Sequence, residues 1–128
     1  MRTLDTNVVV RLLIGDDPQQ TPIAERAFLE AIASGGVYLS DVVLAEVAWV
    51  LRGYDLGRSE RYALLERLVR TRGVVVDDID AVIEALDQFR QGGDLADQLI
   101  LARAASAAAL PVLSFEMRFA VQQGVDQL

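Results

Sequence analysis

Residues 4–10 read Leu-Asp-Thr-Asn-Val-Val-Val, so an acidic residue, Asp5, stands where apolar packing is expected. Residues 2–4 predict a short strand and residues 8–14 predict a short helix, which places Asp5 at the junction between them. A buried carboxylate costs several kcal/mol unless it is hydrogen-bonded, paired with a charge or bound to a cation. Asp5 is therefore expected to have a partner, and a metal ion is one such partner.

The same order, a short β-branched strand followed by a helix, is repeated along the chain. Strands are expected at residues 2–4, 37–39, 74–76 and 112–113. Helices are expected at residues 8–14, 21–33, 42–51, 58–71, 79–91, 94–109 and 116–121. This alternation predicts parallel βαβ units, and hence a three-layer α/β/α fold around a central, mainly parallel sheet of short strands. At 128 residues the chain is expected to form one domain, residues 1–128.

Further acidic residues lie in settings like that of Asp5. Glu46 lies in the helix after the second strand, Asp94 and Asp97 open the helix that leads to a late strand, and Glu116 follows that strand. Ligands of parallel sheets collect beyond the carboxyl ends of the strands. This topology allows all of these acids to converge on one metal-holding pocket.

Each acid also has a structural interpretation. Asp5 and Asp94 are each placed to cap a helix, and Glu116 is placed either to cap a short helix or to pair with Arg118. Glu46 is the only charged residue of residues 42–51, a helix that is apolar nearly all round and is therefore expected to be largely buried. A structural ion pair between Glu46 and a distant arginine is the alternative there.

The composition restricts the chemistry that the chain can perform. It contains no Cys, no His and no Lys, so all 12 cationic side chains are Arg. Thiolate and histidine metal sites and cysteine nucleophiles are therefore excluded. Carboxylate oxygens remain as metal ligands, and these favour hard ions such as Mg²⁺ or Mn²⁺.

The net charge of −7 argues against a protein that coats nucleic acid generally, although half of the arginines are concentrated in one segment. These six are Arg52, Arg58, Arg61, Arg67, Arg70 and Arg72. The candidates for contacts with an RNA backbone are Arg58, Arg61, Arg67 and Arg70. A solvated helix face with offsetting charges is an equally good interpretation.

The chain has no apolar stretch long enough to span a membrane and no signal-peptide layout. We therefore expect a cytoplasmic protein with no membrane partner.

Four stretches together resemble the PIN-domain ribonucleases and, among them, the VapC-type toxins of bacterial toxin–antitoxin pairs. They are Leu-Asp-Thr-Asn-Val at residues 4–8, Leu-Ala-Glu-Val-Ala-Trp-Val-Leu-Arg at residues 44–52, Gly-Gly-Asp-Leu-Ala-Asp-Gln-Leu-Ile at residues 92–100 and Ser-Phe-Glu-Met-Arg-Phe at residues 114–119. The resemblance covers essentially the whole chain, in order, spacing and flanking residues.

The resemblance implies a metal-dependent endoribonuclease whose catalytic acids are Asp5, Glu46, Asp97 and Glu116. The same four and Asp94 are the expected ligands of Mg²⁺ or Mn²⁺. Position 116 is more often Asp in the family, and the additional methylene of Glu should shift the carboxylate by about an ångström. The expected supporting residues are Thr6, Asn7, Ser114 and Arg118. Thr6 and Asn7 are expected to fix Asp5 by hydrogen bonds.

The resemblance further implies an RNA substrate, a homodimer and a cognate antitoxin that covers the pocket. The chain contains aromatic residues that such an interface needs, namely Phe28, Trp49 and Tyr54, although they could equally belong to the core.

Three alternatives remain open on the sequence. A non-catalytic PIN-like module would bind RNA or protein with the same acids. A HAD-like phosphatase would use Asp5 as a nucleophile, but it normally needs a second Asp where this chain has Asn7, and usually a Lys. The missing Lys also counts against a receiver-type signalling domain.

Overall fold

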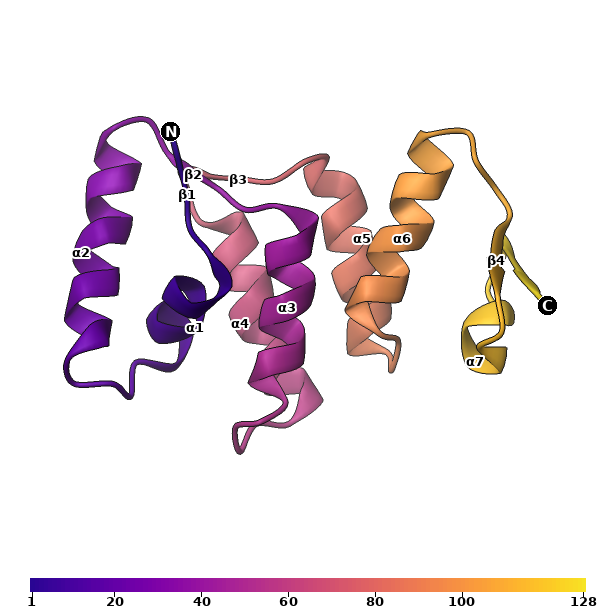
Figure 1. Ribbon diagram of the computed structural model, residues 1–128, viewed down its shortest axis with the longest axis horizontal. Coiled ribbons are helices and arrows are strands. Elements are labelled where there is room, and N and C mark those ends of the chain that lie inside the picture. Colours follow the sequence, from indigo (N-terminus) through magenta and orange to yellow (C-terminus); the bar gives the residue numbers. More distant parts are fainter. The chain divides into compact units, whose positions relative to one another are not determined.

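The computed structural model describes all 128 residues, which form two compact units, Met1–Ile79 and Asp80–Leu128. The first unit contains β1 (Arg2–Thr3), α1 (Thr6–Ile14), α2 (Gln20–Ala33), β2 (Val37–Tyr38), α3 (Asp41–Leu51), α4 (Arg58–Arg70) and β3 (Val74–Val75). The second unit contains α5 (Ile79–Arg90, whose first residue belongs to the first unit), α6 (Leu95–Ser106), β4 (Val112–Ser114), α7 (Met117–Ala120) and β5 (Val125–Gln127) (Figure 1).

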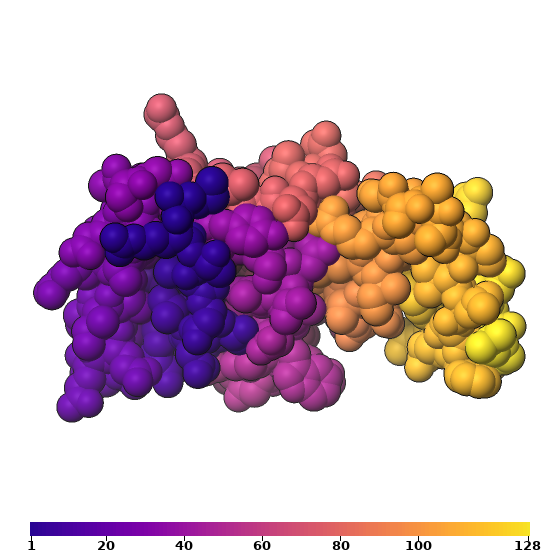
Figure 2. Space-filling view, turned by 45° about the horizontal axis from the view of Figure 1, so that its top comes forward, coloured from indigo at the N-terminus to yellow at the C-terminus, as the bar shows by residue number.

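The strands of the first unit form one parallel sheet in the order β1-β2-β3. Arg2 pairs with Val37, and Val37 pairs in turn with Val74. As the edge strand, β1 is exposed, and the N-terminal residues lie at the surface of the unit (indigo in Figure 2). Helices alternate with these parallel strands, so the predicted α/β class is confirmed.

The core of the first unit lies between its helices and the central strand. Helix α1 packs against α2 and α3, and α3 packs against α4. Val9 of α1, Val37 of β2 and Leu65 of α4 have no exposed surface. In α3 the buried residues follow a helical period, namely Leu44, Val47, Ala48 and Leu51. This packing fixes α1, which Asp5 caps, against α3, which carries Glu46.

Polar side chains accept hydrogen bonds from backbone N–H groups at the starts of α2 and α3. Asp17 Oδ1 accepts hydrogen bonds from the backbone N–H groups of Gln19 and Gln20, at 2.9 and 2.7 Å, and these bonds hold the pKa of Asp17 below its ordinary value. Ser40 Oγ accepts a hydrogen bond from Val43 N at 3.3 Å and so caps α3. Such bonds satisfy N–H groups that have no partner within the helix.

Helix α6 ends at Ser106, three residues before the predicted end at residue 109. Ala108 adopts a left-handed conformation (φ 54°), the N–H of Ala109 bonds to the carbonyl of Ala104, and that of Ala108 bonds to the carbonyl of Ala105. This is a Schellman ending, in which Gly normally occupies the left-handed position. The prediction was wrong because the run of alanines carries no glycine signal and has the highest helix propensity.

The second unit contains a two-stranded parallel sheet formed by β4 and β5. Val112 pairs with Val125, and Ser114 pairs with Gln127. The sequence did not predict β5, because Val125 is its only apolar and only β-branched residue and the segment shows no alternation. No helix in the chain has the length and apolar character needed to cross a membrane.

Candidate active site

Asp5 lies directly after β1, as predicted, and caps α1. Its Oδ1 accepts a hydrogen bond from Val8 N at 3.2 Å, and its side chain is exposed rather than buried. Helix α1 begins at Thr6, two residues before the predicted start at residue 8. The capping role is therefore confirmed, while the expectation that Asp5 is buried is wrong. Capping uses one carboxylate oxygen and leaves Oδ2 without a hydrogen bond.

Glu46 is linked to the residue that follows Asp5. The hydroxyl of Thr6 donates a hydrogen bond to Glu46 Oε2 at 3.1 Å, across 40 residues of sequence. This bond holds a carboxylate of α3 at the first residue of α1. It is also the only polar contact of Glu46, which forms no ion pair with an arginine.

This hydrogen bond corrects the predicted roles of Thr6 and Asn7. Both were expected to fix Asp5, but Thr6 orients Glu46 instead, and the exposed Asn7 makes no side-chain hydrogen bond. The expectation misassigned Thr6 because residues adjacent in sequence point to different sides of a helix. The support that Asp5 receives comes from the backbone of Val8.

Helix α3 is not buried all round, contrary to the prediction. Glu46 is exposed, and Val42 and Trp49 are 65% and 66% exposed. Because nearly all residues of α3 are apolar, its composition does not show that one face is buried and the other is exposed. The open face carries Val42, Glu46 and Trp49 at intervals of four and three residues, so these side chains form one stripe.

In the second unit, Asp94 and Asp97 occupy the start of α6. Asp94 caps the helix, since its Oδ1 accepts a hydrogen bond from Asp97 N at 3.0 Å. Asp97 lies in the first turn and is half-buried. This division, with Asp94 as the cap and Asp97 free of that role, agrees with the sequence prediction.

A pocket of about 650 Å³ joins these acids to Glu116 and Arg118 within the second unit. Its wall comes from the end of α5, the Gly92-Gly93 turn, the start of α6 and the α7 region. Gln98 also lines the pocket and is only 4% exposed. The prediction did not single out Gln98, although a polar residue in the apolar run from Leu95 to Ile100 was the available signal.

The acids around this pocket are close enough to affect one another. Burial raises the pKa of Asp97 above its ordinary value, and the neighbouring charges of Asp94 and Glu116 raise it further. Like charges disfavour ionisation of a carboxyl group, so a cation at this place would relieve the repulsion. The surroundings of Asp97 therefore oppose its charge.

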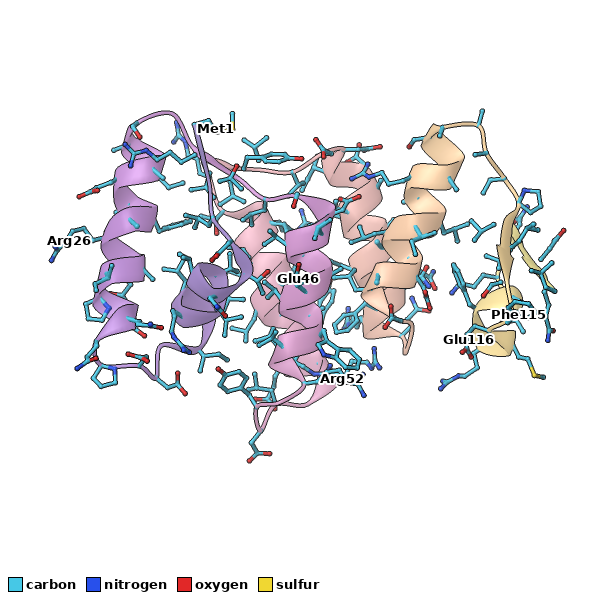
Figure 3. The ribbon with its side chains drawn as sticks, viewed as in Figure 1. Met1, Arg26, Glu46, Arg52, Phe115 and Glu116 are labelled. Atoms are coloured by element: carbon cyan, nitrogen blue, oxygen red, sulfur yellow. The ribbon has the colours of Figure 1, made fainter.

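Glu116 has neither of the structural roles that the sequence allowed. It stands at the N-cap of α7, yet its side chain accepts no capping hydrogen bond, and it forms no ion pair with Arg118. The predicted support from Ser114 is present, because Ser114 Oγ accepts a hydrogen bond from Glu116 N at 3.0 Å. Figure 3 shows Glu116 beside Phe115 at α7. Its carboxylate is exposed and is therefore open to a ligand.

The four arginines proposed for RNA do not form a single row on α4. Arg58 and Arg67 are nine residues apart, which is about two and a half helical turns, so they lie on opposite sides of the helix. Arg70 forms an ion pair with Glu66, in which Nε of Arg70 lies 3.8 Å from Oε2 of Glu66. Arg61 is half-buried, and burial lowers its pKa, with smaller contributions from the charges of Arg58 and Arg52.

Residues 3–123 match the protein-family model described as PIN domain. The chain belongs to the PIN-domain family. PIN domains are generally nucleases that act on RNA, they bind RNA, and they typically use divalent metal ions. Comparison with curated proteins and with solved structures gives no match.

The donor chemistry of this PIN domain fits a hard divalent cation. Every candidate ligand is a carboxylate, and such oxygens are the ligands that Mg²⁺ and Mn²⁺ prefer. The crowding of Asp97 by Asp94 and Glu116 is the structural observation that agrees with a cation there. Within neither unit, however, are three or more acidic side chains arranged to hold a metal ion by themselves.

Proposed function

We propose that this PIN domain is a metal-dependent endoribonuclease that hydrolyses RNA phosphodiester bonds. The observation that carries the proposal is Asp97, a half-buried carboxylate with a raised pKa beside two further acids, in the wall of an open pocket. A structural carboxylate would normally be paired with a cation, and Asp97 has no ion pair. Perturbed carboxylates in clefts are typical of functional sites.

The proposed site residues are the acids that the resemblance to PIN-domain ribonucleases implies. Asp5, Asp97 and Glu116 are the proposed ligands of one or two Mg²⁺ or Mn²⁺ ions, with Asp94 beside them. Such an ion lowers the pKa of bound water and stabilises negative charge on a phosphate. Glu46 either completes the set of ligands or takes the proton of the attacking water. For that second role Glu46 Oε1 is available, since the Thr6 hydroxyl bonds to Oε2.

The decisive experiment is incubation of the pure chain with total cellular RNA. Cleavage is expected with Mg²⁺ or Mn²⁺, and it should stop with a chelator and in the variants Asp5→Asn and Asp97→Asn. The matched controls are Glu25→Gln in α2 and Asp126→Asn in β5, two exposed acids outside the proposed set. Cleavage that persists in chelator or in both site variants would refute the proposal.

A non-catalytic PIN-like module is the second candidate, and one observation favours it. Neither unit contains three acids arranged to hold an ion. This alternative predicts RNA binding without cleavage under every metal condition. The same incubation, followed on a labelled RNA for binding and for cleavage, separates the two candidates.

We further infer a role as the toxin of a toxin–antitoxin pair in the cytoplasm, on the strength of the resemblance to VapC-type toxins. That role includes a homodimer and a cognate antitoxin that covers the acids. Of the three aromatic residues considered for such an interface, Trp49 is exposed, whereas Phe28 and Tyr54 are half-buried. Growth arrest on expression, relieved by co-expression of a neighbouring antitoxin gene, is the expected result. Light scattering of the pure chain tests the dimer.

A further inference from the structure

The most unusual side chain on the open face of α3 is Trp49, the single tryptophan of the chain. It is 66% exposed, and the guanidinium carbon of Arg52 lies 4.6 Å from the centre of its ring. Because Arg52 covers one side of the indole, so large an exposure means that the remaining ring surface is open to solvent. An open indole ring that already has a guanidinium group on one side offers its other surface to a planar ligand.

The position of Trp49 relates it to the proposed chemistry. Trp49 is three residues after Glu46, so the two side chains share one face of α3, about one helical turn apart. Figure 3 shows Glu46 midway along α3 and Arg52 at the end of the same helix. An extended ligand that passed Glu46 along the open face of α3 would therefore meet the indole ring of Trp49 next.

The charges beside Trp49 favour a nucleic acid over a protein as this ligand. Arg52 takes part in no ion pair. The charges of Arg58 and Arg52 also reach Arg61, whose pKa they lower after the larger effect of burial. A guanidinium group over an open aromatic ring, with further arginines on the adjoining α4, matches a ligand that has planar bases and phosphates.

We propose that Trp49, held by Arg52, is a stacking platform for an unpaired base of a single-stranded RNA bound along α3. Aromatic residues and arginines hold single strands in this way, because every base has a face that can stack. The proposal deepens the proposed ribonuclease function and rests on it, since it identifies how the same site would select single-stranded substrate. Trp49 is a binding residue and takes no part in bond cleavage.

The first test uses the intrinsic fluorescence of Trp49, which no other tryptophan obscures. The protein is titrated in chelator with a short unstructured RNA, and in parallel with an abasic ribose-phosphate strand of equal length. Stacking should quench the fluorescence with the RNA and leave it nearly unchanged with the abasic strand. Equal quenching by both strands, or by neither, overturns the proposal.

The second test measures affinity by the anisotropy of a labelled RNA. Trp49→Ala should bind about 5- to 150-fold more weakly, as expected for the loss of one stacked base, whereas Trp49→Tyr should retain most of the affinity. Val42→Ala is the matched control, because Val42 is equally exposed on the same stripe. For the cation, Arg52→Gln is compared with Arg26→Gln on α2, which Figure 3 shows pointing away from its unit.

These measurements distinguish this proposal from the function on which it rests. Because binding is measured without metal, a chain that binds RNA through Trp49 but never cleaves it refutes only the ribonuclease. Metal-dependent cleavage that continues with unchanged RNA affinity in Trp49→Ala refutes only the stacking platform. The platform is also refuted if Trp49→Ala turns a dimer into a monomer without changing RNA affinity, because Trp49 would then belong to a protein interface.

Discussion

The acids of the first unit are held by hydrogen bonds, whereas the second unit also crowds its acids around one pocket. Asp5 is bonded to the backbone of Val8, and Glu46 is bonded to Thr6. Asp97 instead lies beside Asp94 and Glu116, where burial and like charge raise its pKa. The difference indicates that the first unit supplies direction to its carboxylates, while the second supplies a concentration of negative charge that a cation can relieve.

This comparison predicts that the largest loss of activity follows a change at Asp97, the acid that Asp94 and Glu116 crowd. Asp97→Asn keeps the size of the side chain and removes its charge. The single-turnover rate of RNA cleavage should fall on the order of 10²- to 10⁴-fold. This range is typical of a side chain that takes a direct part in the reaction. A fall below tenfold would mean that the pocket of the second unit is not the centre of the reaction.

The orienting contact of the first unit should have a smaller effect. Thr6→Val keeps the shape of the side chain and removes the hydroxyl that bonds to Glu46. Loss of a supporting partner of this kind typically costs 10- to 100-fold in activity or metal affinity. Thr6→Ser retains the donor and should keep most of the rate. Equal rates for wild type and Thr6→Val would show that Glu46 needs no orientation by α1.

The extent to which the sequence predicted these arrangements depends on the distance over which each contact acts. The caps at Asp5 and Asp94, and the position of Asp97 one turn after its cap, follow from residues close together in the chain. These local features were predicted. The bond between Thr6 and Glu46 was missed because it depends on the packing of α1 against α3.

The open face of α3 was missed for a different reason. Composition reports how apolar a helix is, but it does not report how much of it finds a partner. Val42 and Trp49 are as apolar as Leu44 and Val47, yet only the latter two are buried. Without the structure, Trp49 was indistinguishable from a core residue.

In the second unit a hydrogen bond also holds the backbone at Glu116, and its removal should have a modest effect. Ser114→Ala deletes the hydroxyl that accepts the hydrogen bond from Glu116 N. A neutral hydrogen bond contributes about 1 kcal/mol, so the cleavage rate should fall roughly 2- to 10-fold. Ser114→Thr should retain the rate. A loss as large as that of Asp97→Asn would contradict the view that crowding, rather than orientation, governs this unit.

The smallest expected effect is a change in stability. Measured without metal, it tests directly whether the neighbouring acids oppose the charge of Asp97. A raised pKa means that the folded protein binds the proton of Asp97 more tightly than the unfolded chain does, whose ordinary value is 3.8. Ionisation of Asp97 therefore opposes folding, and stability is lost as the pH rises through the folded pKa. Asp97→Asn should raise the melting temperature at neutral pH in chelator, and the gain should shrink as the pH falls toward 3.8.

The matched control for this measurement is Asp126→Asn, which changes an exposed carboxylate in β5 of the same unit. It should not reproduce the gain in melting temperature. Together with the activity loss expected for Asp97→Asn, a stability gain would show that the charge is retained at a cost to folding, as is common where a residue serves function. A lower melting temperature for Asp97→Asn at neutral pH would instead mean that the favourable position of its charge at the start of α6 outweighs the crowding.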